Sequence, residues 1–133
     1  MAKSSIRSLQ GARVLIVEDE FLIAYDLVRA IGAAGAEPVG PVATVDKAEA
    51  LVAKGNIDVT VLDINLRGTM ATDFALDLTK RKMPCLIVSG YGEHSLPRSV
   101  DHVPRLEKPA RVERVIDELA DILDQRRAFA ESQ

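Results

Sequence analysis

The sequence predicts an α/β fold with one doubly wound sheet of five parallel strands in the order 2-1-3-4-5. Short apolar runs alternate with longer segments of helical period, which is the pattern of repeated βαβ units. The second run contains Pro38 and Pro41. Because proline donates no hydrogen bond to a neighbouring strand, this strand belongs at an edge of the sheet. A sheet whose second strand is outermost fits this strand order, and its ligands bind beyond the carboxyl ends of the strands.

Five apolar runs are the predicted strands, and the segments between them are the predicted helices. The runs cover residues 14–17, 39–43, 59–62, 86–88 and 103–106. The 133 residues contain no internal repeat or linker and are enough for one domain with its own core. We place that domain at residues 13–127, with an N-terminal tail at 1–12 and a C-terminal tail at 128–133.

The first and last helices have the clearest apolar periodicity. In the last helix the apolar positions repeat at helical spacing; they are Val112, Val115, Ile116, Leu119, Ile122 and Leu123. In the first helix a spacing of about 100° per residue places one apolar face toward the sheet; that face is Phe21, Ala24, Tyr25, Val28 and Ile31. Leu22 falls outside this face, so we expect an exposed leucine there.

Composition excludes several classes of protein. The net charge is −3 and no Lys/Arg-rich block is present, so nucleic acid is not expected as the main partner. No apolar run approaches the roughly 18 residues that a membrane-spanning helix needs, and residues 1–10 lack the apolar core of a signal peptide. Cys85 is the single cysteine, which excludes a disulfide or a thiolate metal site within one chain. We expect a cytoplasmic protein without a membrane partner.

Polar side chains follow four of the five predicted strands. Glu18 and Asp19 follow the first strand, Asp63 the third, Ser89 the fourth and Lys108 the fifth. Because the carboxyl ends of parallel strands share one edge, these groups should converge on one site. Crowded carboxylates repel one another unless a cation joins them, and oxygen ligands with room for water favour Mg²⁺. Asp63 is then a candidate nucleophile toward a phosphoryl group, with Ser89 and Lys108 contacting the phosphoryl oxygens.

This combination resembles the receiver domains of bacterial two-component response regulators. The resemblance implies a receiver fold, a phosphoryl transfer from a sensor histidine kinase to Asp63, and Mg²⁺ bound by Asp19, Asp63 and, through water, Glu18. It also implies that Asn65 offers its backbone carbonyl to the metal, that Ser89 is the switch hydroxyl, and that Lys108 pairs with the phosphate. The Lys108–Pro109 peptide bond is expected to be cis.

Two features depart from the usual receiver pattern. Arg105 stands where receivers usually carry a switch aromatic, and Ser89 is followed by Gly90 and Tyr91. The pattern is similar to a subgroup of stand-alone receivers that lack the switch aromatic. We therefore expect phosphorylation to reshape residues 90–101, and we expect no attached output domain.

The expected function is that of a single-domain response regulator, with no enzymatic activity beyond its own phosphorylation and dephosphorylation. It would act as a monomer or weak homodimer, either through a downstream target protein or as a phosphate sink. Two other classes of α/β protein share part of this pattern. A haloacid-dehalogenase-like phosphatase has its nucleophile on the first strand, whereas Asp63 is on the third. A flavodoxin-like nucleotide binder needs a phosphate-binding loop after the first strand, where the acidic residues Glu18, Asp19 and Glu20 would repel the phosphate.

Overall fold

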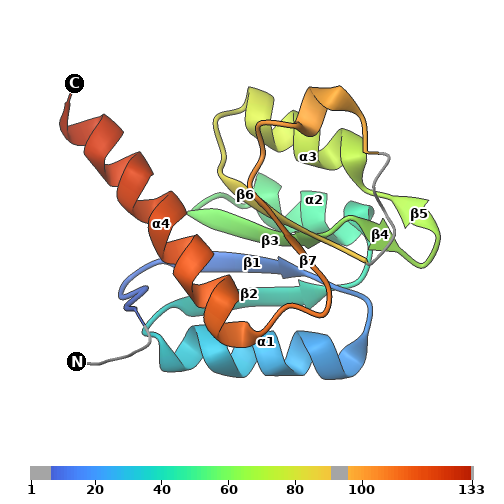
Figure 1. Ribbon diagram of the computed structural model, residues 1–133, viewed down its shortest axis with the longest axis horizontal. Helices are drawn as coiled ribbons and strands as arrows, with labels where there is room; N and C mark the ends of the chain where they lie inside the picture. The colour runs from blue at the N-terminus through green and yellow to red at the C-terminus, as the bar shows by residue number, and fades with distance from the viewer. Residues whose placement is uncertain (1–6, 91–95, 133) are drawn as a thin grey trace.

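The computed structural model describes residues 7–90 and 96–132. Its main sheet has five parallel strands in the order β2-β1-β3-β6-β7. The strands are β1 (Arg13–Val17), β2 (Glu37–Val42), β3 (Val59–Asp63), β6 (Cys85–Ser89) and β7 (Arg105–Glu107). Since β6 and β7 are the fourth and fifth predicted strands, the predicted fold class and strand order are confirmed (Figure 1).

Strand β2 lies at the edge that its prolines predicted. Its pairing with β1 is irregular between Leu15 and Val17, and the Gly40–Pro41 peptide bond is cis. Gly40 has φ +92°, and a Cβ there would lie 3.0 Å from both Ile16 O and Val42 N. Only glycine therefore fits this close approach of the two backbones.

Two pairs of helices cover the two faces of the sheet (Figure 1). Helices α1 (Phe21–Ala33) and α4 (Val112–Glu131) pack against one face, and α2 (Val45–Ala53) and α3 (Thr72–Lys80) pack against the other. Successive strand residues point to opposite faces, so Val14 and Ile16 belong to the first core while Leu15 and Val17 belong to the second. No helix in the described part of the chain is long and apolar enough to span a membrane.

The predicted phase of α1 is wrong. Its buried residues are Ala24, Leu27 and Ile31, whereas Phe21 and Tyr25 are 77% and 49% exposed. Because α1 is apolar on more than one side, periodicity alone allowed two phases. Packing of α1 against β2 and α4 selects the face that contains Leu27. Leu22 is 73% exposed, as predicted.

Several elements differ from the expected boundaries. A short hairpin, β4 (Asn65–Leu66) and β5 (Thr69–Met70), precedes α3. Between β6 and β7 the described residues form a short 3-10 turn, η1 (Arg98–Val100). Helix α4 continues four residues past the expected limit at 127. In the expected N-terminal tail, Leu9 is buried and its amide donates to Ala34 O at 2.8 Å.

Candidate functional site

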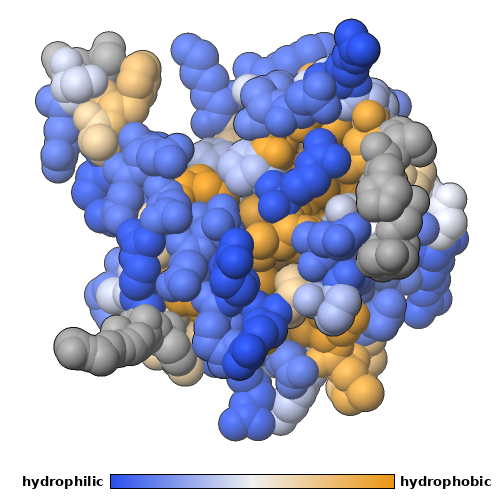
Figure 2. Space-filling model, in the orientation of Figure 1, coloured by the Kyte–Doolittle hydropathy of each residue, from blue (hydrophilic) through white to orange (hydrophobic). Residues whose placement is uncertain are grey.

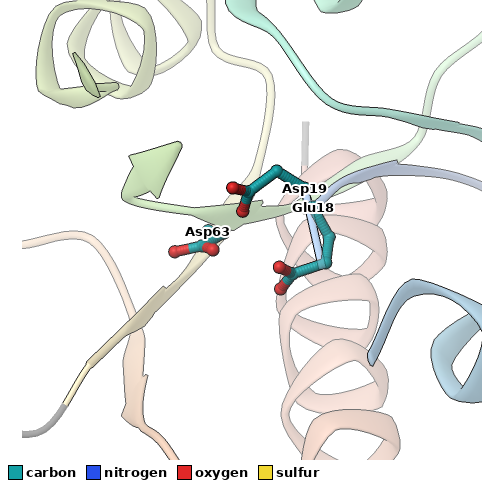
Figure 3. Close-up of side chains that lie close together, drawn as sticks. All are labelled: Glu18, Asp19 and Asp63. Atoms are coloured by element: carbon teal, nitrogen blue, oxygen red, sulfur yellow. The ribbon is translucent and has the colours of Figure 1, made fainter. Parts of the chain in front are cut away.

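The carboxyl ends of β1 and β3 bring three acidic side chains together. Glu18 and Asp19 directly follow β1, and Asp63 is the last residue of β3. One carboxylate oxygen from each lies within 4.8 Å of the others (Figure 3). Glu18 and Asp63 are 5% and 4% exposed, so two of the carboxylates are held largely out of water. We call Glu18, Asp19 and Asp63 the acid pocket.

Backbone hydrogen bonds fix the acidic side chains. The Glu20 amide donates to Glu18 Oε2 at 3.0 Å, and the Asn65 amide donates to Asp63 Oδ1 at 3.1 Å. The backbone of Glu18 is itself held, because its amide donates to Val42 O at 2.9 Å. The orientation of these carboxylates is therefore set by the loops that follow the strands.

Lys108 reaches the acid pocket from the loop after β7. Its Nζ lies 3.0 Å from Asp63 Oδ2 and 3.2 Å from Glu18 Oε1. The Lys108 amide donates to Ser89 O at 2.7 Å, and the Lys108–Pro109 peptide bond is cis, as expected. The lysine is thus placed by main-chain contacts and pairs with two buried carboxylates at once.

Burial shifts the pKa values of this group of charges. It raises the pKa of Glu18 to about 7; the Asp63 charge adds to the shift, while the Glu20 amide and Lys108 oppose it. Burial also raises the pKa of Asp63, against the opposing effect of Lys108. For Lys108, burial alone would lower the pKa, but the two carboxylates outweigh it and the pKa is raised. Lys108 therefore stays charged, and it compensates only part of the cost of burying two acids.

Ser89 and Asn65 lie next to strand β3, whose last residue is Asp63: Ser89 ends the neighbouring strand β6, and Asn65 follows Asp63 by two residues. Ser89 is buried at the carboxyl end of β6, the strand that pairs with β3 on the side away from β1. The Asn65 side chain is engaged in the hairpin, where its Oδ1 accepts a hydrogen bond from the Gly68 amide at 2.8 Å. The strand ends thus bring together the regions that the sequence predicted, while the roles of Ser89 and Asn65 stay predictions.

The sequence reasoning missed Arg67. This residue lies at the tip of the β4–β5 hairpin, and its Nε is 3.4 Å from Asp19 Oδ2. The available signal was Gly68, which follows Arg67 and marks a tight turn shortly after Asp63. The sequence did not predict the β4–β5 hairpin, so it did not show that this turn brings the chain back toward the end of β1.

An apolar cavity of about 370 Å³ lies beside the acid pocket. Glu18, Asp63 and Lys108 line its polar side, and its apolar walls come from α1, the strands and the start of α4; they include Ile23, Leu27, Val61, Val88 and Val115. Figure 2 shows that apolar side chains reach the surface in a central band on one face of the molecule, bordered by hydrophilic residues. The charged groups therefore face an apolar wall, which strengthens their mutual interactions.

Of the switch positions, Arg105 is described and Tyr91 is not. Arg105 is exposed on the edge strand β7, and its Nη2 lies 3.5 Å from Val100 O. Residues 91–95 of the 90–101 segment, which include Tyr91, lie outside the described residues. The expected rearrangement of that segment therefore stays a prediction.

Comparison with known proteins places the chain in a family. No family model and no curated protein matches it. Among solved structures, SdrG from Sphingomonas melonis Fr1 is 38% identical, with a TM-score of 0.73 over 84% of this chain and 96% of that chain. The response regulator PhyR from Brucella abortus is 26% identical, with a TM-score of 0.79 over 95% of this chain and 53% of that chain. A response regulator receiver domain protein from Clostridium thermocellum, 16% identical, shares the fold with a TM-score of 0.76 over 89% of this chain and 98% of that chain.

A five-stranded parallel sheet with an acidic cluster at the carboxyl ends of its strands is consistent with the fold and the phosphoacceptor site of receiver domains. The chain belongs to the receiver domains of the response regulators of two-component systems. These receivers are in general signalling modules rather than enzymes.

The donor atoms of the acid pocket fit a divalent metal ion. Three carboxylates offer hard oxygen ligands within 4.8 Å of one another, and two of them are buried. Mg²⁺ is bound in proteins by one or two carboxylates with several retained waters. An acidic cluster of this kind is typical of the Mg²⁺ site of receivers.

Proposed function

We propose that this protein is a single-domain response regulator whose Asp63 accepts a phosphoryl group from a histidine kinase. The observation that carries the proposal is the position of Asp63 at the end of the central strand β3. Its Oδ2 lies 3.0 Å from Lys108 Nζ, and its carboxylate lies in a cluster with Glu18 and Asp19. The 38% identity with SdrG over 84% of this chain supports the assignment to the response regulators.

Each residue would have a distinct part in the transfer. An Asp63 carboxylate oxygen attacks the phosphorus of a phosphohistidine, the new O–P bond forms as the P–N bond breaks, and the histidine nitrogen keeps the electron pair and takes up a proton. Lys108 stabilises the negative charge on the phosphoryl oxygens, and Ser89 donates a hydrogen bond to one of them. Mg²⁺, held by Asp19, Asp63, the Asn65 carbonyl and, through water, Glu18, would neutralise further charge on the same oxygens.

The output would be a protein contact. A sensor histidine kinase is the expected upstream partner. The protein would either contact a downstream target protein or act as a phosphate sink for a kinase that also serves another regulator. Neither nucleic acid nor a membrane is part of this proposal, and the protein would act as a monomer or weak homodimer. Its chemistry would be limited to its own phosphorylation and dephosphorylation.

Phosphorylation by a small donor tests the proposal directly. Incubation with acetyl phosphate and Mg²⁺ should add the mass of one phosphoryl group, and hydroxylamine should remove it because the product is an acyl phosphate. Asp63→Asn should stay unmodified, whereas Asp58→Asn, which changes an acid at the opposite end of β3, should be modified normally. Modification of Asp63→Asn at the wild-type rate would contradict the assignment. Chelation of Mg²⁺ should abolish the reaction.

A further inference from the structure

Arg67 is paired with the acidic residue that the proposed metal site needs. Its Nε lies 3.4 Å from Asp19 Oδ2. The Asp19 side chain is 10% exposed, whereas the Arg67 side chain is 78% exposed. The guanidinium therefore approaches Asp19 from the solvent side.

The backbone holds Arg67 in a conformation that arginine rarely adopts. Arg67 and Gly68 form the two-residue loop of the β4–β5 hairpin, with φ +54° and +87°. Positive φ at both positions is the type I′ turn, in which Asn, Asp or Gly is strongly preferred at the first position. An arginine with positive φ is uncommon, and such conformations concentrate at functional sites.

The hairpin is attached to the acid pocket at its other end. The Asn65 amide donates to Asp63 Oδ1 at 3.1 Å, and Asn65 Oδ1 accepts from the Gly68 amide at 2.8 Å. Two hydrogen bonds thus connect the turn to the phosphoacceptor. The position of Arg67 relative to Asp19 is consequently set by the pocket itself and not by a free loop.

The charges of the pocket divide between two cations. Lys108 pairs with Glu18 and Asp63, and Arg67 pairs with Asp19. When all three carboxylates are ionised, they and the two cations leave one net negative charge. A divalent cation that binds Asp19 directly must share this carboxylate with the guanidinium or displace it.

We propose that Arg67 competes with Mg²⁺ for Asp19 and so lowers the affinity of the acid pocket for the metal. Metal binding releases the guanidinium, which then lies free on the solvent side of Asp19. This inference rests on the proposed function, because it takes Mg²⁺ as the cation of the pocket. Arg67 would thus affect metal binding at the site through its charge, without itself binding the metal.

Isothermal titration of the full chain with MgCl₂ measures the competition. Arg67→Asn removes the charge and suits the left-handed turn, so the hairpin should stay folded. We expect its Kd for Mg²⁺ to be about two- to fivefold lower than that of the wild type, the range of a partly exposed ion pair. Arg67→Lys keeps the charge and should remain closer to the wild type. The difference should shrink as the NaCl concentration rises, because salt screens exposed charges.

Arg127→Asn is the matched control. It removes the same charge from an ion pair with Asp124 on α4, near the amino-terminal end of the sheet. Its Kd for Mg²⁺ should equal that of the wild type. A tighter Kd in both variants would mean that net charge, and not the pair with Asp19, sets the affinity, and the inference would be overturned.

A spectroscopic measurement follows the ion pair itself. The Arg67 Nε–H signal in NMR spectra should move during the Mg²⁺ titration of the wild type. In metal-free Asp19→Asn it should already lie near the position it has in the Mg²⁺-loaded wild type. An unchanged Kd in Arg67→Asn, or an Arg67 signal that ignores Mg²⁺, refutes the inference while leaving the phosphoacceptor role of Asp63 intact. A wild-type protein that binds no Mg²⁺ removes the metal from the proposed function and the inference with it.

Discussion

At the scale of single residues, the buried polar side chains fall into two groups: those at the proposed site and one within a strand. The described part of the chain buries four of them, namely Glu18, Thr60, Asp63 and Ser89. Three lie at strand ends, where the proposed chemistry needs them, and their burial costs free energy that the hydrophobic cores must offset. The fourth, Thr60, lies within β3, and its hydroxyl has no hydrogen-bond partner among the described residues.

Replacing Thr60 by valine should stabilise the protein. The substitution keeps the shape of the side chain and removes an unsatisfied hydroxyl, so we expect the free energy of unfolding to rise by about 1 kcal/mol. Urea denaturation measures the change. Thr79→Val is the control, because the Thr79 hydroxyl donates to Ala75 O at 3.0 Å and its loss should bring no gain. A destabilised Thr60→Val would show that the hydroxyl has a partner after all.

The pH dependence of stability should report the acid pocket. The folded pKa of Glu18 is raised from 4.5 to about 7, and that of Asp63 is raised as well. The folded state then binds more protons than the unfolded state in this window, so the contribution of these two groups to stability without metal is lost as the pH rises. The free energy of unfolding should fall as the pH rises from about 5 to about 8. The raised pKa of Lys108 adds no slope there, because the lysine is charged in both states.

Glu18→Gln isolates the Glu18 contribution. This variant should be more stable than the wild type at pH 8, and its stability should depend less on pH across the same window. Denaturation in the presence of a chelator gives both curves. A wild-type stability that increases from pH 5 to pH 8 would contradict the raised pKa values.

At the scale of elements, helix α1 presents an apolar surface to solvent beside the acid pocket. Phe21 and Tyr25 stack with ring centroids 6.3 Å apart, and the Arg29 guanidinium lies 5.7 Å from the Tyr25 ring centroid. Leu22 lies next to Phe21 and is equally exposed. Single exposed leucines are common and need no explanation, but three large exposed residues together favour a contact with a partner. Phe21 and Tyr25, which the sequence predicted to be buried, thus add to the exposed apolar surface that Leu22 alone had suggested.

Leu22→Asp should slow phosphotransfer from the cognate kinase at least about tenfold, since a charge would enter the centre of an apolar contact. Stability and phosphorylation by acetyl phosphate should stay nearly unchanged, because the side chain is exposed. Phe129→Asp is the control: it places the same charge on an exposed apolar position near the end of α4. Equal transfer rates in Leu22→Asp and the wild type would place the docking surface elsewhere.

At the scale of the whole molecule, four segments far apart in the chain meet at one edge of the sheet. The acid pocket comes from the ends of β1 and β3, Lys108 reaches it from the loop after β7, and Ser89 ends the neighbouring strand β6. A ligand that joins the acidic groups therefore stabilises the entire fold. Binding at ten times the Kd contributes about 1.4 kcal/mol to the free energy of unfolding. Site and stability are therefore linked, although most of the core lies away from the acid pocket.

Mg²⁺ at tenfold above its Kd should raise the melting temperature by roughly 5 °C. Asp19→Asn should reduce this shift, whereas Asp46→Asn, which changes an acid in the first turn of α2, should not. Differential scanning calorimetry with MgCl₂ and with a chelator measures it. A melting temperature that is indifferent to Mg²⁺ would argue against the acid pocket as a metal site.

Local patterns in the sequence determined the fold class, the strand order and the positions of the strand ends. Apolar runs identify buried strands, Pro38 and Pro41 exclude a central position for β2, and parallel strands must bring their carboxyl ends to one edge. Glu18, Asp19, Asp63 and Lys108 could therefore be assigned to one site from sequence alone. The contacts between them, at 3.0 to 3.2 Å for Lys108, agree with that assignment.

Only the tertiary structure decided which side of α1 is buried and which cation meets Asp19. Periodicity could not choose between two apolar faces of α1, because the choice depends on the packing of α1 against β2 and α4. The pairing of Arg67 with Asp19 depends on a hairpin of two-residue strands, too short to leave a periodic signal. Both features arise from contacts between segments distant in the chain. Local sequence shows at most that a turn occurs at Gly68, and it does not show which distant residue that turn approaches.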